Sequence, residues 1–224
     1  MKILKHVSAQ TLLAATLWMV GSSGSGMAQS FSVGVRGGIP FTDFLEAAGN
    51  RDLYYVTNTK RYTVGPTVEI GLPLNFRVSA DALYKRVGFD FSDVRVGQNL
   101  ASSRTRGNSW EFPIMLKLDM ASGPIRPFLG AGVAFRHISG ITQVQQIVSG
   151  VTFQQVEVEN PAEFNKETDT GFVFGGGIVL KAGRVRIGPE LRYTRWGGEN
   201  LRDPIRALLR TNRNQGEVLV GITF

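Results

Sequence analysis

Apolar and polar residues alternate along much of this chain, in segments of about ten residues that are separated by turn residues. Alternation with a period of two is typical of strands that have one apolar and one polar face. Residues 110–119 show it most clearly, because Glu111, Lys117 and Asp119 interleave with large apolar side chains. Pro113 cannot donate to a neighbouring strand, so it predicts a bulge or an unpaired position there. The pattern predicts eight strands, at residues 31–39, 62–72, 76–89, 110–119, 127–138, 170–181, 184–196 and 217–224.

The links between these segments alternate between short and long. Bacterial outer-membrane barrels combine short periplasmic turns with long outer loops. This alternation of short and long links therefore predicts an all-β fold, an antiparallel up-and-down transmembrane β-barrel of eight strands. A ten-stranded barrel is the alternative, because residues 141–148 and 151–158 flank Ser149-Gly150 and can form a hairpin. We interpret that hairpin as an extension above the membrane. The short links lie near Pro73, Ser122 and Ala182, and the long ones at about 40–61, 90–109, 139–169 and 197–216.

Side-chain size indicates which face of the strands meets lipid. The interior of a barrel of about eight strands is only wide enough for side chains to fill it. The polar face carries glycines such as Gly34, Gly65 and Gly188, whereas the rings of Trp110 and Tyr193 belong to the apolar face. We therefore expect acyl chains to wet the apolar face and the polar face to enclose the lumen.

The polar face then brings charges of both signs into the lumen. Buried charges without a partner are strongly unfavourable, so we interpret these residues as a salt-bridge network that largely plugs the barrel. The alternative is that they line a narrow passive pore. The predicted network consists of Arg36, Glu69, Asp81, Lys85, Glu111, Lys117, Arg186, Glu190, Arg192 and Glu217.

The N-terminal segment predicts export. Lys2 and Lys5 precede an apolar run over residues 12–20, and small residues follow. This order is typical of a secretory signal peptide, and the run is too short for a membrane-spanning helix. We expect a signal peptide over residues 1–28 that is cleaved at its end, a barrel domain over residues 29–224, and localisation in the outer membrane.

Cysteine content and charge limit the chemistry further. The chain has no cysteine, which excludes disulfides, thiol catalysis, cysteine-based metal sites and a cysteine-linked lipid anchor. The formal net charge of +7 falls to +5 when the two lysines of the signal peptide are removed. On an exported protein a basic surface favours the phosphates of anionic lipid or lipopolysaccharide, so we expect no nucleic acid among the partners.

Four segments resemble one known family. Residues 110–117, Trp-Glu-Phe-Pro-Ile-Met-Leu-Lys, are similar to the aromatic-Glu-x-Pro strand of small outer-membrane β-barrel proteins of the OmpA-like, porin-family type. Residues 126–133 are similar to the family's Pro-aromatic-x-Gly-x-Gly strand, and residues 190–193 and 218–224 complete the resemblance. It implies an integral, non-enzymatic barrel with a structural or surface-binding role. The resemblance also gives the C-terminal aromatic residue, Phe224, the role of a signal for the outer-membrane assembly machinery.

One motif suggests an enzyme instead. His137-Ile138-Ser139 has the spelling of the His-x-Ser motif of lipid A deacylases, a related barrel family that hydrolyses acyl esters. That family carries the motif near its C-terminus, where residues 192–197 of this chain contain no histidine. We therefore expect a non-enzymatic protein with His137 at the outer rim, and keep an acyl-ester hydrolase as the second alternative. Without a spaced cluster of ligands we also expect no metal and no cofactor.

The last long link carries three arginines. Asp203-Pro204 resembles a helix N-cap followed by a first-turn proline, so residues 205–210 predict a short helix. Arg202, Arg206 and Arg210 would share one side of it and could contact anionic lipid. The simpler interpretation is a solvated loop helix. We expect the barrel to be a monomer.

Overall fold

A computed structural model describes residues 30–42, 45–47, 55–57, 61–93, 100–149, 152–159, 168–198 and 209–224. The regular structure of these residues consists of strands, and they include no helix long and apolar enough to cross a membrane. The predicted signal peptide, residues 1–28, lies outside the described residues.

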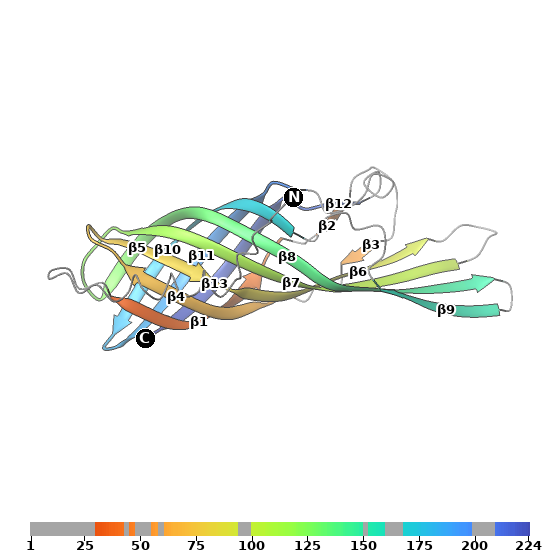
Figure 1. Cartoon of the computed structure of the whole chain (residues 1–224), viewed down its shortest axis with the longest axis horizontal. Helices are drawn as coiled ribbons and strands as arrows, with labels where there is room; N and C mark the ends of the chain where they lie inside the picture. The colour runs from red at the N-terminus through yellow and green to blue at the C-terminus, as the bar shows by residue number, and fades with distance from the viewer. Residues whose placement is uncertain are drawn as a thin grey trace, which may run out of the picture.

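The strands form a closed antiparallel barrel with eight positions, as predicted (Figure 1). Neighbours in sequence are neighbours in the ring, and β1 closes the ring against β13 through pairs from Gly34↔Thr223 to Pro40↔Glu217. A closed ring has no open sheet edge, so the strands can satisfy their hydrogen bonds within a membrane. The positions are β1 (Phe31–Pro40), β4 (Thr63–Gly71), β5 (Phe76–Asp81) together with β6 (Leu83–Asp93), β7 (Leu100–Asp119), β8 (Ile125–Ser149), β10 (Thr168–Ala182), β11 (Val185–Trp196) and β13 (Asn214–Thr223).

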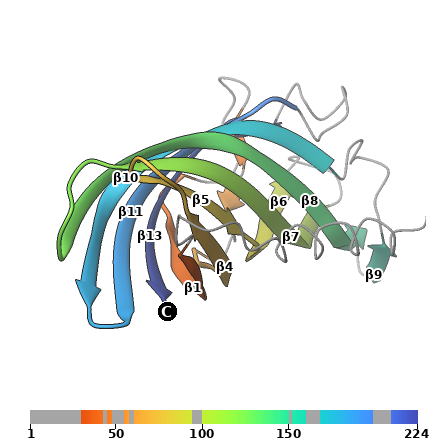
Figure 2. The same ribbon diagram turned by 60° about the vertical axis from the view of Figure 1, so that its left-hand side comes forward.

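The two ends of the barrel differ. Short turns at residues 72–75, 120–124 and 183–184 lie at the end where β1 begins and β13 finishes, which we call the short-turn end (Figure 2). In the first turn Leu74 and Asn75 both have positive φ, which fits a two-residue hairpin turn. At the opposite end β6, β7, β8 and β9 (Thr152–Glu159) project beyond the other strands (Figure 1).

Two strands are longer than predicted. β7 begins at Leu100, whereas the alternation predicted a strand only over 110–119, and β8 runs without a break from the predicted span 127–138 through the first arm of the predicted hairpin to Ser149. The outer part of β8 pairs with β9 (Thr152–Glu159), so this hairpin extends the sheet beyond the ring and adds no further pair of spans. Residues 100–109 are mostly polar, because the outer part of the strand no longer faces acyl chains although its backbone ladder continues.

Three short strands lie in the long links. β3 (Tyr55–Thr57) pairs with β6, and β2 (Leu45–Ala47) pairs with β12 (Leu209–Thr211). The helix predicted at 205–210 is therefore wrong at its C-terminal end, because the backbone of Leu209 and Arg210 is extended and paired with β2. Residues 201–208, which include Arg202 and Arg206, lie outside the described residues.

Pro113 leaves one side of its strand unpaired. On the side of β7 that faces β5 and β6, the pairing stops at Ala80↔Ile114 and resumes at Leu83↔Glu111 in the same register, so Pro113 is skipped. A proline offers no N–H to this ladder, and the residue between β5 and β6 donates its N–H to β4 instead. The predicted unpaired position is confirmed, and it divides the strand predicted at 76–89 into β5 and β6.

The two faces of the ring have the predicted contents. Large apolar side chains point outward, and Phe31 and Phe224 are 65% exposed on the isolated chain. An apolar outer surface of this kind is typical of a barrel that contacts acyl chains. On the glycine-rich strands β8 and β10, Phe128 and Val173 point into the lumen, while Phe174 points outward.

Glycines occupy lumen-facing positions where neighbouring backbones come close together. A Cβ atom added to Gly34 would lie 1.9 Å from the carbonyl oxygen of Ile222, and one added to Gly132 would lie 1.9 Å from that of Ile114. No side chain fits at such distances. These positions are the small-residue face that a narrow barrel requires.

Candidate functional site: the charged lumen

Buried charges of both signs line the lumen. Among the described residues twelve charged side chains are buried, six cationic and six anionic, so their formal charges cancel. Strand geometry directs every second side chain to the same face of the sheet, and these charges lie at inward positions. The cations are Arg36, Arg77, Lys85, Lys117, Arg136 and Arg192, and the anions are Glu69, Asp81, Glu111, Asp169, Glu190 and Glu217.

A central cluster joins two carboxylates to three cations. Asp81 accepts hydrogen bonds from Arg36 Nη1 at 2.9 Å and from Arg192 Nη2 at 2.8 Å. Glu190 lies 2.6 Å from Lys117 Nζ, 2.8 Å from Arg192 Nη2 and 3.2 Å from Arg36 Nη1. All five side chains are at most 3% exposed, so each ion pair lies away from water.

Towards the short-turn end the cluster continues through Glu69. Its Oε1 accepts a hydrogen bond from Arg36 Nη2 at 3.2 Å, and its Oε2 accepts one from Arg77 Nη1 at 2.9 Å. Arg77 Nη2 also donates to Asp119 Oδ1 at 2.8 Å. A chain of alternating charges therefore runs from the centre of the lumen to its short-turn end.

A second cluster lies towards the opposite end. Lys85 Nζ is 2.5 Å from Glu111 Oε1 and 3.9 Å from Glu217 Oε1, so one lysine serves two buried carboxylates. Gln215 Nε2 donates to Glu111 Oε2 at 2.8 Å, and Gln215 Oε1 accepts a hydrogen bond from Trp196 Nε1 at 3.0 Å. Polar and aromatic side chains from four strands meet here.

Arg136 and Asp169 form a third contact near this end. Arg136 Nη2 lies 3.1 Å from Asp169 Oδ2, and the guanidinium stands 4.2 Å above the ring of Trp196. Asp169 Oδ1 also accepts hydrogen bonds from the backbone N–H groups of Thr170 and Gly198, both at 2.8 Å. These bonds fix the carboxylate where β10 enters the ring.

Two contacts cross the full width of the barrel. In the ring β5 and β11 occupy opposite walls, and so do β7 and β13. The bond from Arg192 to Asp81 joins the first two walls, and the bond from Gln215 to Glu111 joins the second two. Side chains therefore meet across the lumen at two levels.

Apolar side chains occupy the space between the charged clusters. Met115, Val173 and Leu219 are completely buried, and the first two pack with Ala134 and Trp196. The alternation predicted a polar lumen and did not predict this apolar layer. Apolar packing beside ion pairs excludes water and strengthens their attraction.

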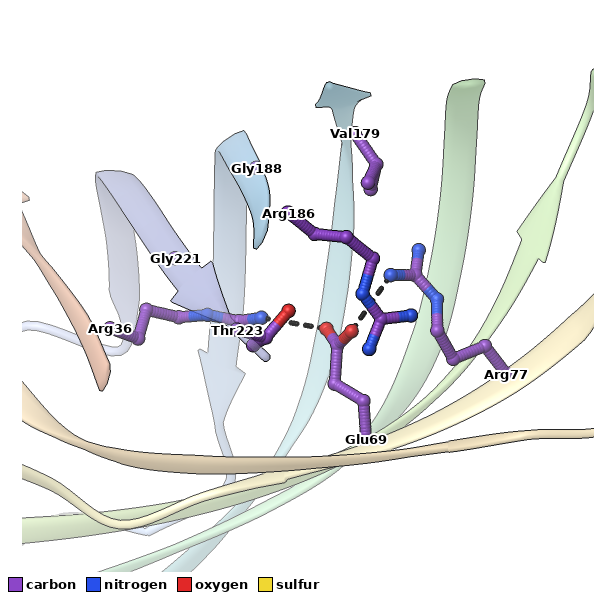
Figure 3. Close-up of a pocket in the computed structure, with 8 residues that line it drawn as sticks. All are labelled: Arg36, Glu69, Arg77, Val179, Arg186, Gly188, Gly221 and Thr223. Atoms are coloured by element: carbon purple, nitrogen blue, oxygen red, sulfur yellow. Dashed lines mark hydrogen bonds and ion pairs between the residues drawn. The ribbon is translucent and has the colours of Figure 1, made fainter. Parts of the chain in front are cut away.

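A small pocket lies at the short-turn end of the lumen (Figure 3). The pocket has room for about one water molecule. Strands from both sides of the ring supply its walls. The residues that line it are Arg36, Glu69, Arg77, Val179, Arg186, Gly188, Gly221 and Thr223.

The structure buries nine of the ten side chains that the sequence assigned to the lumen network. The tenth, Arg186, is half-buried, and its hydrogen bond among the described residues goes to the hydroxyl of Ser32. The sequence analysis missed Arg77, Arg136 and Asp169. Extending the alternation of its strand would have found Arg77, whereas Arg136 lies in a strand with apolar residues on both faces and Asp169 precedes the predicted strand.

The remaining candidate residues, His137, Ser139 and Phe224, all lie in the described part of the chain. His137 Nδ1 lies 3.3 Å from Thr168 Oγ1, and within the described residues it has no bond to Ser139 or to a carboxylate. The contact between nucleophile and base that hydrolysis needs is therefore missing. No group of acidic residues and histidines that could hold a metal ion occurs in the described part of the chain. Phe224 donates its N–H to the carbonyl of Val33 at 2.9 Å and points outward.

Known proteins resemble this chain in sequence pattern and in fold. The family model described as outer membrane protein beta-barrel domain matches residues 27–197. Neisserial surface protein A (NspA) is 13% identical with a TM-score of 0.43, over 88% of this chain and 98% of NspA. Ail, the attachment invasion locus protein of Yersinia pestis, is 11% identical with a TM-score of 0.34, over 88% of this chain and 97% of Ail. The N-terminal β-barrel domain of Pseudomonas aeruginosa OprF is 11% identical with a TM-score of 0.33, over 88% of this chain and 99% of that domain. No curated protein matches the sequence.

Proposed function

The chain belongs to the outer membrane protein β-barrel domain family, and from this premise we propose that it is a monomeric, non-enzymatic structural component of the outer membrane whose lumen is closed by its own side chains. Family membership gives the location in the outer membrane. The closed lumen and the structural role are inferred from the buried charges.

The two contacts across the width of the barrel carry the proposal. An ion that passed the centre would have to separate Asp81 from Arg36 and Arg192. Leaving one member of a buried ion pair without its partner costs about 3–5 kcal/mol. The bond from Gln215 to Glu111 presents a second obstacle, and the apolar layer lies between the two.

The same network supports a structural role, because it specifies the register of the strands. A shift by one residue would move every inward side chain of a strand to the lipid face. An arginine or lysine at the middle of the bilayer destabilises a barrel by about 2–4 kcal/mol. A slipped β11 would expose Arg192 to lipid and leave Asp81 without that partner, so the native register is strongly favoured.

Outward-facing arginines support contact with anionic lipid. Tyr84 and Trp110 pack together on adjacent strands with ring centroids 5.3 Å apart, and such rings favour the membrane–water interface. Arg86 and Arg106 are exposed on the same two strands, further from the short-turn end. We therefore include lipopolysaccharide phosphates among the partners. The arginines of the last long link, Arg202, Arg206 and Arg210, are proposed to add to this surface, and the assembly machinery is proposed to recognise the last strand with Phe224.

Single-channel recording in planar bilayers tests the closed lumen. We expect no resolved openings from the native protein. We expect openings from Asp81→Ala combined with Arg192→Ala, which removes one cation and one anion from opposite walls. A matched control, Arg86→Ala combined with Glu157→Ala, removes two exposed charges and should stay silent. Resolved openings from the native protein would instead support the narrow pore.

The hydrolase alternative has its own test. Replacing His137 and Ser139 by alanine should leave the acylation of lipid A unchanged, since the ring of His137 contacts Thr168 and has no bond to Ser139 among the described residues. Mass spectrometry of lipid A from cells that express either form measures this. A loss of acyl chains that depends on His137 would contradict the non-enzymatic role.

A further inference from the structure

Three arginines converge on the pocket at the short-turn end of the lumen. Arg36 and Arg77 are almost completely buried, and Arg186 reaches the same space from the opposite wall (Figure 3). Glu69 is the one carboxylate that lines the pocket. The pocket wall is therefore strongly cationic.

The carboxylates nearby do not balance these three cations. Glu69 accepts hydrogen bonds from both Arg36 and Arg77, and Asp119 accepts one from Arg77. Arg186 makes no ion pair with any described carboxylate, and its hydrogen bond goes to the Ser32 hydroxyl. Arg36 also takes part in the central cluster, where three cations already share two carboxylates. The half of the lumen next to the short-turn end thus has an excess of positive charge, which favours a bound negative charge.

Hydrogen-bond donors also point into the free space. A Cβ atom added to Gly221 would lie 3.3 Å from Arg36 Nε and 3.5 Å from Arg36 Nη2, so the Nε–Nη2 edge of this guanidinium lies over Gly221 in the wall of the pocket. Arg36 Nε and Arg77 Nε are buried and have no acceptor in the described part of the chain. Two adjacent N–H groups of one guanidinium are the arrangement that binds an anion side-on.

Two glycines line this space, and the room for a side chain lies at Gly188. Apart from its chain neighbours, a Cβ atom added to Gly188 would approach no atom more closely than 3.8 Å, and at Gly221 it would press against Arg36. Any side chain here would fill the pocket. The space that remains is about the size of one water molecule, which suits a guest of a single atom.

We propose that this pocket binds one small inorganic anion of halide size, held between Arg36, Arg77 and Arg186. The anion accepts hydrogen bonds from the side-on edge of Arg36 and from Arg186, and it neutralises the excess charge. Because Arg186 is half-buried, the anion enters and leaves at the short-turn end. The site shares Arg36 with the central cluster, but it includes neither of the contacts across the barrel on which the closed lumen rests, Arg192 to Asp81 and Gln215 to Glu111.

Urea unfolding of the protein extracted from membranes in detergent tests the site, with sodium bromide replacing sodium gluconate at constant ionic strength. For one site that only the folded state offers, the unfolding constant should fall about tenfold for each tenfold rise in bromide above the dissociation constant. Arg186→Gln should abolish this dependence. It leaves no buried carboxylate without a partner, so we expect it to fold. Arg184→Gln, an exposed arginine on the adjacent turn, is the matched control and should keep the dependence.

A second variant and a direct observation complete the test. Gly188→Ala fits the backbone and takes up part of the pocket, so it should weaken the bromide response without unfolding the barrel. Crystals soaked in bromide should show an anomalous peak between Arg36, Arg77 and Arg186. An equal bromide response in the native protein and in Arg186→Gln, or the absence of that peak, would overturn the proposal. Neither result would affect the conductance test of the closed lumen.

Discussion

Replacing Asp81 by asparagine removes one negative charge from the centre of the lumen and keeps the shape of the side chain. In the native protein this carboxylate accepts hydrogen bonds from Arg36 at 2.9 Å, from Arg192 at 2.8 Å and from Thr67 Oγ1 at 2.6 Å. After Asp81→Asn, six buried cations face five buried anions. Both guanidinium groups lose a charged acceptor that solvent cannot replace.

The size of the loss in stability depends on the carboxylates that each arginine still contacts. Removing one partner from a buried ion pair destabilises a protein by about 3–5 kcal/mol. Arg36 still contacts Glu69 and Glu190, and Arg192 still contacts Glu190, so the lower end of that range applies. We therefore expect Asp81→Asn to lower the free energy of unfolding by about 3 kcal/mol, a change of roughly 100-fold in the unfolding constant.

Equilibrium unfolding in urea, with the protein in lipid vesicles, measures this difference. Tryptophan fluorescence is a suitable signal, because Trp110 faces lipid and Trp196 is buried in the lumen. In Asp81→Asn combined with Arg192→Met, the two effects should fall short of additivity by about 1–3 kcal/mol, since the residues are in contact. The exposed control Glu157→Gln should change the free energy of unfolding by less than about 0.5 kcal/mol. A loss of less than about 1 kcal/mol for Asp81→Asn would refute the claim that the buried network stabilises the barrel.

Three further predictions concern the lipid face, the contact between two backbones and a hydrogen bond in the lumen, and all use the same unfolding assay. Leu191→Arg places a charge on the lipid face and should destabilise the barrel by about 2–4 kcal/mol in vesicles, and an unchanged stability would mean that β11 has the opposite orientation. Gly132→Ala should prevent folding or destabilise the barrel strongly, because its Cβ would meet the carbonyl of Ile114. Gly188→Ala should be tolerated, and equal stability of the two variants would contradict the close approach of Gly132 to the backbone of Ile114. Trp196→Phe removes the N–H that donates to Gln215 Oε1 and should lower the free energy of unfolding by about 1–3 kcal/mol. An unchanged stability would mean that water reaches the amide of Gln215.

Much of the fold could be predicted because the membrane imposes a simple chemical contrast on each strand. The order and number of the strands, their faces and the short turns follow from alternation in segments such as 110–119. The prediction lost accuracy where that contrast disappears. β7 and β8 continue beyond the apolar band, and nothing in a polar stretch such as 100–109 distinguishes a paired strand from a loop. The helix expected at 205–210 failed for a related reason, since pairing of β12 with β2 overrides a local capping pattern.

The sequence by itself determined which side chains face inward wherever the two faces of a strand differ in chemistry, because a strand alternates its faces. Lys117 and Glu190, for example, could be assigned to the lumen from position alone. Only the tertiary structure decided which charges meet, since partners such as Asp81 and Arg192 are 111 residues apart and are joined by the curvature and stagger of the closed ring. The same closure left Arg186 without an ion pair among the described residues and opened a pocket beside it. No periodicity along the chain contains that information, because it arises from distances across the lumen.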